Sequence, residues 1–426
     1  MARTGIFTEY PNLRYYLAAR LGATLAQMAM VVVIGWQVYD IARETMDTKA
    51  AAFQLGLVGI VQFLPLLLLT LVVGWVADRI DRRWIARGAI GLEFFCAATL
   101  GLLTWHDAIT LPALFAVAAL LGVARAFAGP ALQALAPNLV PPALLPRMIA
   151  MSSIAWQTGA IGGPALGGYL YAAGHSVPYA VSAGLFGLAF LSMMMIGPVP
   201  RSRMIGTSKP WLQMIEGLRY VRRNRIVLGA ISLDLFVVLL GGTTAMLPIY
   251  ARDILQVGPE GLGHLRAAPA VGAAATALWL SFRPLRTNVG PKMFAGVALF
   301  AVTSLIFGLS RSLPLSLVCL VLLGVGDMVS VFVRQSLIQI YTPDDMRGRV
   351  GAVSTLFISG SNELGEARAG LAASLVGPVV AVAGGGAAAL AATYLCSRWF
   401  PELRNARNFD PPRDLNDLQK IQETTQ

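Results

Sequence analysis

Several acidic and basic side chains lie inside long apolar stretches of this 426-residue chain. In a hydrocarbon environment a charge is tolerated only when it is paired, hydrated or neutralised by a proton. Acids in such places can bind and release protons, and arginines can pair with them or with an anionic ligand. The sequence therefore indicates proton or ligand binding by a set of buried charges, which are Arg20, Arg125, Asp234, Asp327, Glu363, Glu366 and Arg368.

Asp234 is the first candidate for proton coupling. It lies in the stretch Ile-Ser-Leu-Asp-Leu-Phe, where it could exchange a proton or contact a ligand; the alternative is a fixed ion pair with an arginine of another helix. Asp327 and Arg334 are seven residues apart and so lie two turns along one helix face, with Arg334 as either a gate or an interfacial anchor. Gln27 suits either the wall of a cavity or a contact between helices.

A second group of charges lies near residue 365. Glu363 and Glu366 are three residues apart and share a helix face, with Arg368 elsewhere on the same stretch. Three charges in one membrane helix cannot all face lipid. We therefore expect them to line a central cavity, to pair with Arg20 or Arg125, or both.

The composition requires a membrane to position these residues. Hydrophobic residues make up 56% of the chain and charged residues 13%, which leaves too much apolar surface for a soluble protein. The net charge of +11 comes from short clusters between apolar runs, which argues against nucleic acid as a partner. Cys96, Cys319 and Cys396 lie inside apolar runs, so neither disulfides nor a metal site is expected. The first apolar stretch is too long for a cleavable signal and should remain as a membrane helix.

A spanning helix needs about 20 mostly apolar residues, and twelve segments meet this requirement. The residues 198–225 form a basic linker between a bundle of six helices over 1–197 and a second bundle over 226–400, and 401–426 form a polar tail. The even-numbered loops are rich in arginine and the odd-numbered loops carry few cations, so both termini should be cytoplasmic. The expected helices are 14–40, 52–74, 84–105, 111–133, 148–172, 177–197, 226–250, 262–283, 291–309, 313–336, 349–373 and 376–398.

Sequence patterns for other chemistry are missing. There is no Gly-x-x-x-x-Gly-Lys-Ser/Thr loop for ATP, and no His-Glu-x-x-His, Cys-x-x-Cys or Gly-x-Ser-x-Gly pattern. We therefore expect no catalytic activity, no cofactor and no bound metal. Any transport must draw its energy from a gradient.

The loop after the second apolar segment carries a dense charge pattern. Residues 74–83 read Gly-Trp-Val-Ala-Asp-Arg-Ile-Asp-Arg-Arg, a tight hinge typical of a short cytoplasmic loop. The pattern resembles the loop signature of the major facilitator superfamily, with Asp81 where that signature has glycine. The resemblance implies a cytoplasmic gate, with Asp78 as its central residue; the gate residues are Gly74, Asp78, Arg79, Arg82 and Arg83.

Two further segments resemble the same superfamily. Arg125-Ala-Phe-Ala-Gly129 is similar to its Arg-x-x-Gln-Gly motif, with Ala128 in place of glutamine, which implies a position near a proton pathway; the alternative is a structural arginine that extends toward the cytoplasm. Glu93 is given less weight, because the third helix is peripheral in this family. The segment 159–168 is rich in small residues, which allows ordinary tight packing but also resembles the antiporter motif; the matching residues are Gly159, Gly163, Pro164, Gly167 and Gly168.

Within the superfamily, the chain resembles the bacterial enterobactin-exporter-like branch through segments 35–39, 125–133, 346–350 and 362–370. The resemblance implies an all-α membrane protein with twelve helices in two pseudo-symmetric bundles. It also implies a monomer of the bacterial inner membrane that works by alternating access, with a small-molecule substrate, protons and membrane lipids as partners. The substrate would be a siderophore, drug or similar amphiphile. A lysophospholipid facilitator of the same fold and a non-transporting membrane sensor or enzyme are the alternatives.

Overall fold

The computed structural model describes residues 9–141, 144–198, 210–283, 285, 287–343 and 346–409, and within these ranges the chain is almost entirely helical and contains no strand. Arg201, Arg203 and Lys209 of the expected linker lie outside the described residues, as does the tail from residue 410. Contacts divide the chain into two compact units. Unit 1 is Met1–Thr207, Thr244–Ala267 and Ala373–Pro378, and unit 2 is Ser208–Thr243, Ala268–Ala372 and Val379–Gln426.

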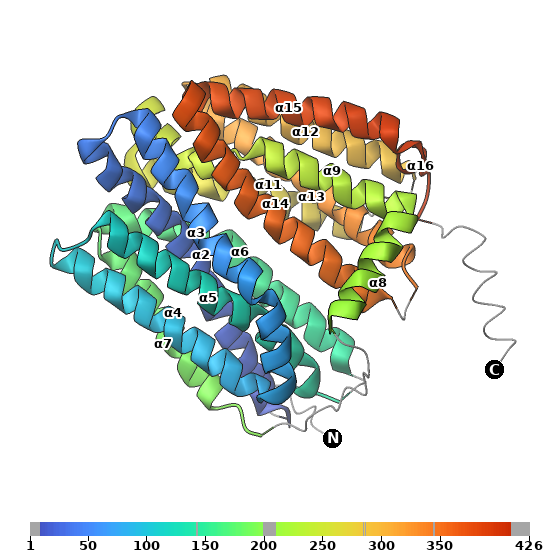
Figure 1. The fold of residues 1–426 in the computed structure, drawn as a ribbon, viewed down its shortest axis with the longest axis horizontal. Coiled ribbons are helices and arrows are strands. Elements are labelled where there is room, and N and C mark those ends of the chain that lie inside the picture. Colours follow the sequence, from blue (N-terminus) through green and yellow to red (C-terminus); the bar gives the residue numbers. More distant parts are fainter. Residues whose placement is uncertain are drawn as a thin grey trace, which may run out of the picture. The chain divides into compact units, whose positions relative to one another are not determined.

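Six long helices make up most of unit 1 (Figure 1). Aspartates cap two of these helices at their N-termini: Asp47 accepts the Ala50 N–H, and Asp81 accepts the Arg83 N–H. The helix α2 (Pro11–Thr45) packs against α6 (Leu145–Ala173) and α7 (Val177–Met194). Similarly, α4 (Arg82–Trp105) packs against α5 (Leu111–Leu135) and α7, and α3 (Thr48–Arg79) packs against α5.

The seventh apolar stretch is broken, unlike the continuous helix expected over 226–250. The helix α9 (Arg225–Gly241) stops because Gly242 adopts a left-handed φ of 54°, which costs glycine little. A side chain at Gly242 would lie 2.7 Å from the Ala369 Cβ. The chain then passes into unit 1 through η3 (Thr244–Met246), α10 (Leu247–Ile249) and the π-helical η4 (Tyr250–Ile254). The helix α11 (Gly258–Phe282) begins in unit 1 and ends in unit 2.

The remaining helices of unit 2 enclose a core that includes Val227, Leu233, Val333 and Leu337. The helix α12 packs closely against α13, and α9 packs against α13, α8 and α16. Asn224 caps α9 by accepting the N–H groups of Ile226 and Val227. The bounds are α8 (Pro210–Arg223), α12 (Val289–Leu309), α13 (Leu313–Ile340), α14 (Arg347–Val376), α15 (Pro378–Trp399) and α16 (Pro401–Arg404).

Ten helices in the described part of the chain are long and apolar enough to cross a membrane. The long helices α6 and α14 bring the set to twelve, and α14 is less apolar because it carries Glu363, Glu366 and Arg368. The helix boundaries extend beyond the expected ones in places, as for 14–40, which becomes Pro11–Thr45.

Candidate functional site

A buried polar cluster lies among α2, α3, α4 and α5 of unit 1. Its centre is Glu93 of α4, which is 2% exposed and accepts a 3.4 Å hydrogen bond from Gln27 Nε2 of α2. Arg125 of α5 lies within electrostatic reach of the Glu93 carboxylate. One guanidinium nitrogen of Arg125 donates to Gln62 Oε1 of α3 at 2.9 Å. The cluster therefore contains one carboxyl group, one guanidinium cation and two amides, each from a different helix.

A glycine explains why Gln62 can reach Arg125. Gly122 lies one turn before Arg125 on α5, and a side chain there would overlap the main chain of α3 at Gln62. The close approach of the two helices brings the Gln62 amide beside the guanidinium group. Arg20, the other arginine expected at this site, instead donates from Nε to the Ser152 carbonyl of α6 at 3.3 Å.

Unit 2 contains a direct ion pair between Asp234 of α9 and Arg334 of α13. Both residues are buried, at 8% and 3% exposure. Asp234 thus has the arginine partner that the sequence analysis gave as an alternative, and Arg334 is buried beside it. The sequence could not identify this partner, because it does not show which faces of α9 and α13 meet.

The charges of α14 have separate surroundings within unit 2. Arg368 donates to the Leu240 carbonyl at 2.6 Å and so satisfies a free carbonyl in the last turn of α9. Glu363 and Glu366 are partly exposed on the same helix. Asp327 lies on α13, seven residues before Arg334.

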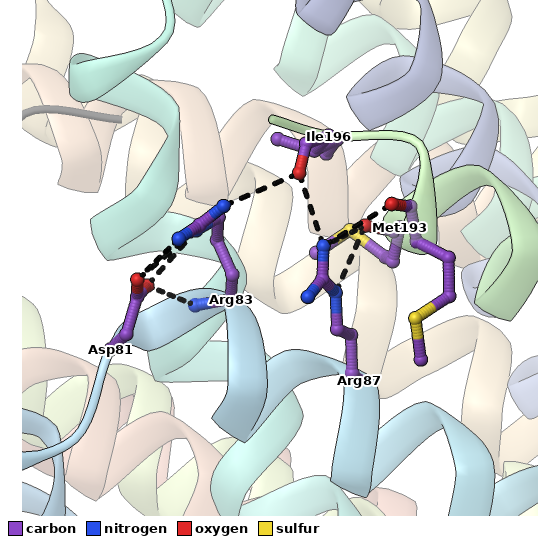
Figure 2. A network of polar contacts seen from close by, with 6 residues as sticks. Asp81, Arg83, Arg87, Met193 and Ile196 are labelled. Carbon is purple, nitrogen blue, oxygen red and sulfur yellow. Dashed lines mark hydrogen bonds and ion pairs between the residues drawn. The ribbon is translucent and has the colours of Figure 1, made fainter. Parts of the chain in front are cut away.

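Arginines in and just after the loop between α3 and α4 donate hydrogen bonds to backbone carbonyls near the ends of other helices of unit 1 (Figure 2). Asp81 caps α4 and forms an ion pair with Arg83, with 2.7 Å between Arg83 Nη2 and Asp81 Oδ2. Arg87 is buried and donates to the carbonyls of Met193 and Ile196 at 3.0–3.1 Å, where α7 ends. The departure from the superfamily signature at Asp81 thus supplies both a helix cap and the partner of Arg83.

Two further arginine contacts complete this loop. Arg83 Nη1 donates to the Ile196 carbonyl at 3.4 Å, and Arg82 donates to the Ala134 carbonyl near the end of α5 at 2.9 Å. Cations at the C-terminal ends of helices are stabilising because the last carbonyls lack partners there. The side chains of Asp78 and Arg79 and the surroundings of Gly74 lie outside the described part of the chain.

The glycines of α6 form two contact surfaces. Side chains at Gly159, Gly163 and Gly167 would lie within 2.6–2.8 Å of atoms of α2, including the carbonyls of Leu25 and Ala29. A side chain at Gly168 would instead overlap Gly263 in the part of α11 that belongs to unit 1. Pro164 lies inside the same helix.

Two neighbouring ion pairs between α2 and η4 in unit 1 were missed by the sequence analysis. Arg43 at the end of α2 pairs with Asp253 of η4 at 3.1 Å, and Asp40 pairs with Arg252. Tyr39 adds a hydrogen bond to Asp253. Arg43 and Arg252 flank odd-numbered loops, so these loops are richer in cations than expected. Each segment carries one acid and one arginine, Asp40 with Arg43 and Arg252 with Asp253. This complementary charge order was the sequence signal that could have indicated the two ion pairs.

The comparison with known families decides what this arrangement belongs to. A model described as Major Facilitator Superfamily matches residues 18–366. The chain belongs to the major facilitator superfamily. As a major facilitator it is a multi-pass membrane transporter of a small molecule and not an enzyme, and the predicted all-α fold of twelve membrane helices is confirmed.

Relatives cover the whole length of this major facilitator. It is 26% identical over 422 residues to an Escherichia coli O1:K1 / APEC protein named Enterobactin exporter EntS, with 97% of each chain covered. A protein of the same name from Shigella dysenteriae serotype 1 is 25% identical over 419 residues, again with 97% of each chain covered. These relatives agree with the predicted resemblance to enterobactin exporters.

Solved structures share its fold. A bacterial homolog to the human lysosomal transporter Spinster, inward-facing and unoccupied, has a TM-score of 0.71 at 16% identity, with 93% of this chain and 99% of that chain covered. A bacterial homologue of the iron transporter ferroportin has a TM-score of 0.65 at 21% identity, with the same coverage. At these identities the likeness concerns the fold alone.

Proposed function

We propose that this major facilitator exports a siderophore or similar amphiphilic small molecule across the bacterial inner membrane in exchange for protons. The observation that carries the proposal is that each unit holds a buried carboxylate near an arginine of another helix, Glu93 with Arg125 and Asp234 with Arg334. Full-length similarity to proteins named enterobactin exporters supports the choice of substrate class.

The proposed mechanism couples protonation of Asp234 to release of Arg334. A proton on the carboxylate removes the charge that holds the guanidinium group, and the freed arginine can then change partner. One proton moving inward supplies about 2.3 kcal/mol per 100 mV of membrane potential. Glu363, Glu366 and Asp327 are proposed to line the substrate cavity, together with Arg20, Gln27 and Arg368.

The proposed organisation follows the same mechanism. Residues 1–197 and 226–400 act as the two bundles of alternating access, 198–225 as a cytoplasmic linker and 401–426 as a cytoplasmic tail. Both termini are cytoplasmic, and the loop at 74–83 is the cytoplasmic gate. The glycines of α6 form the antiporter-type motif, which keeps α6 in close contact with α2. The transporter works as a monomer in contact with membrane lipids.

The test is flux in proteoliposomes under an imposed pH gradient, with wild type beside Asp234→Asn. Enterobactin, a macrolide and a lysophospholipid are offered in turn, and Glu402→Gln, which alters an exposed ion pair with Arg225, is the matched control. We expect gradient-dependent movement of enterobactin that Asp234→Asn abolishes and Glu402→Gln retains. Equal movement with and without the gradient would exclude proton exchange, and movement of the lysophospholipid alone would replace the siderophore as substrate.

A further inference from the structure

Glu93 is an almost completely buried carboxyl group. It lies on the buried face of α4, between the fully buried residues Ile90 and Ala97, and is itself 2% exposed. Its described hydrogen bond is a long one, 3.4 Å from a neutral amide, Gln27. A carboxylate ion in such a place needs either a cation or a proton to offset the loss of hydration.

Among the described residues, Arg125 is the cation that acts electrostatically on Glu93. Arg125 of α5 lies within electrostatic reach, and α7 carries no charged side chain between Val177 and Met194. The one ionisable group of α7, Tyr179, donates to Gln37. On α4 itself, Cys96 lies one turn away from Glu93. The charge state of Glu93 is therefore balanced by Arg125.

Arg125 has a second acceptor that needs no charge. Its guanidinium group donates to Gln62 Oε1 at 2.9 Å, and Gln62 is itself 5% exposed. A buried amide can accept this hydrogen bond whether or not Glu93 is ionised. Arg125 thus has two kinds of partner. Glu93 attracts it only while the carboxylate is ionised, whereas the Gln62 amide can accept its hydrogen bond at any pH.

We propose that Glu93 is a proton-binding carboxyl group of unit 1 and that Arg125 shifts between Glu93 and Gln62 as this proton is bound and released. The proton adds to the carboxylate, the Arg125 guanidinium keeps its charge, and its hydrogen bond passes to the Gln62 oxygen. Release of the proton restores the carboxylate and its attraction for Arg125. This inference deepens the proposed proton exchange and rests on it, because it adds a second proton site to that of Asp234.

The first test measures protonation directly and needs no substrate. Infrared difference spectra of the protein in lipid, taken between mildly acidic and mildly alkaline pH, report the C=O band of protonated carboxyl groups. We expect one component of this band to vanish in Glu93→Gln, to persist with a shifted position in Glu93→Asp, and to remain unchanged in the control Glu402→Gln. A spectrum of Glu93→Gln identical to that of wild type, from protein that elutes as a single folded species, would overturn the proposal.

The second test separates coupling from transport. Proteoliposomes are loaded with enterobactin, and gradient-driven efflux is compared with exchange at equal pH on both sides. We expect Glu93→Gln to lower gradient-driven efflux at least about tenfold, as for loss of a charge-assisted interaction, while exchange continues. Wild-type efflux rates in this variant would contradict a coupling role for Glu93. Absence of any enterobactin movement by wild type would refute the proposed function instead, and the infrared result would still decide the proton site.

Discussion

The two units place an acid and an arginine in their interiors in different ways. In unit 2, Asp234 and Arg334 form a direct pair between α9 and α13, and both are buried. In unit 1, Glu93 and Arg125 each have an amide partner, because Gln27 donates to the acid and Gln62 accepts from the arginine. A direct pair leaves a buried charge uncompensated when it breaks, whereas amides give each member another partner. In unit 2 the pair should therefore open only when Asp234 takes up a proton, whereas in unit 1 Arg125 keeps a neutral partner throughout.

The largest effect should come from breaking the direct pair. Arg334→Leu leaves Asp234 buried without its cation, and we expect a loss of about 3–5 kcal/mol in the free energy of unfolding, measured by SDS titration in mixed micelles. The double variant Asp234→Asn/Arg334→Leu should recover much of this loss, because the unpaired charge is gone. Equal stability of the single and double variants would show that the pair is not the source of the cost.

The equivalent change in unit 1 should cost less. Arg125→Leu removes the cation, but Glu93 keeps the hydrogen bond from Gln27 and can take up a proton. We expect a loss of about 1–3 kcal/mol in the same titration, close to the cost of one unsatisfied buried partner. A loss as large as that of Arg334→Leu would mean that the two sites are equally rigid and would remove the contrast between the units.

Gln62→Leu should make unit 1 resemble unit 2. Without the neutral acceptor, Arg125 loses its hydrogen bond to Gln62, which is worth about 1 kcal/mol. The change should be visible as a modest fall in thermal stability of the solubilised protein, followed by tryptophan fluorescence. Ser192→Ala, at an exposed position on α7, serves as a control and should leave the unfolding temperature unchanged.

The smallest effect should come from an ion pair at the surface. Glu402→Gln breaks the contact with Arg225, whose side chains are 41% and 57% exposed, and should change the free energy of unfolding by about 0–1 kcal/mol. Glu402→Gln tests whether the loss of unfolding free energy in Arg334→Leu is caused by burial of the ion pair or simply by the loss of an ion pair. A change of several kcal/mol here would attribute the cost to pairing alone.

The number and order of helices could be predicted because each membrane helix requires a long apolar run. The break at Gly242 was not predicted, although the pair Gly241-Gly242 is a possible helix end, because the expected helix was defined by the apolar residues on both sides. The surroundings of Glu93 could not be predicted for a similar reason. Its partners Gln27 and Arg125 come from two other helices, and a sequence does not state which helix faces meet.

The loop at Asp81 shows a different limit. The superfamily signature drew attention to Arg82 and Arg83, yet it gave no information on the carbonyls near the ends of α5 and α7 that accept their hydrogen bonds. Arg87, which the loop signature does not include, binds the end of a helix more than a hundred residues away. Charge patterns identify the membrane side of a loop but not the backbone groups that bind its cations.

The row of glycines on α6 has a mechanical consequence. At Gly163 and Gly167 the main chains of α6 and α2 touch without intervening side chains. A contact of this kind contains no rotamers that could absorb a small displacement, so the two helices behave as one stiff lever. We therefore expect a tilt of α6 to move α2, and with it Gln27, the residue that contacts Glu93.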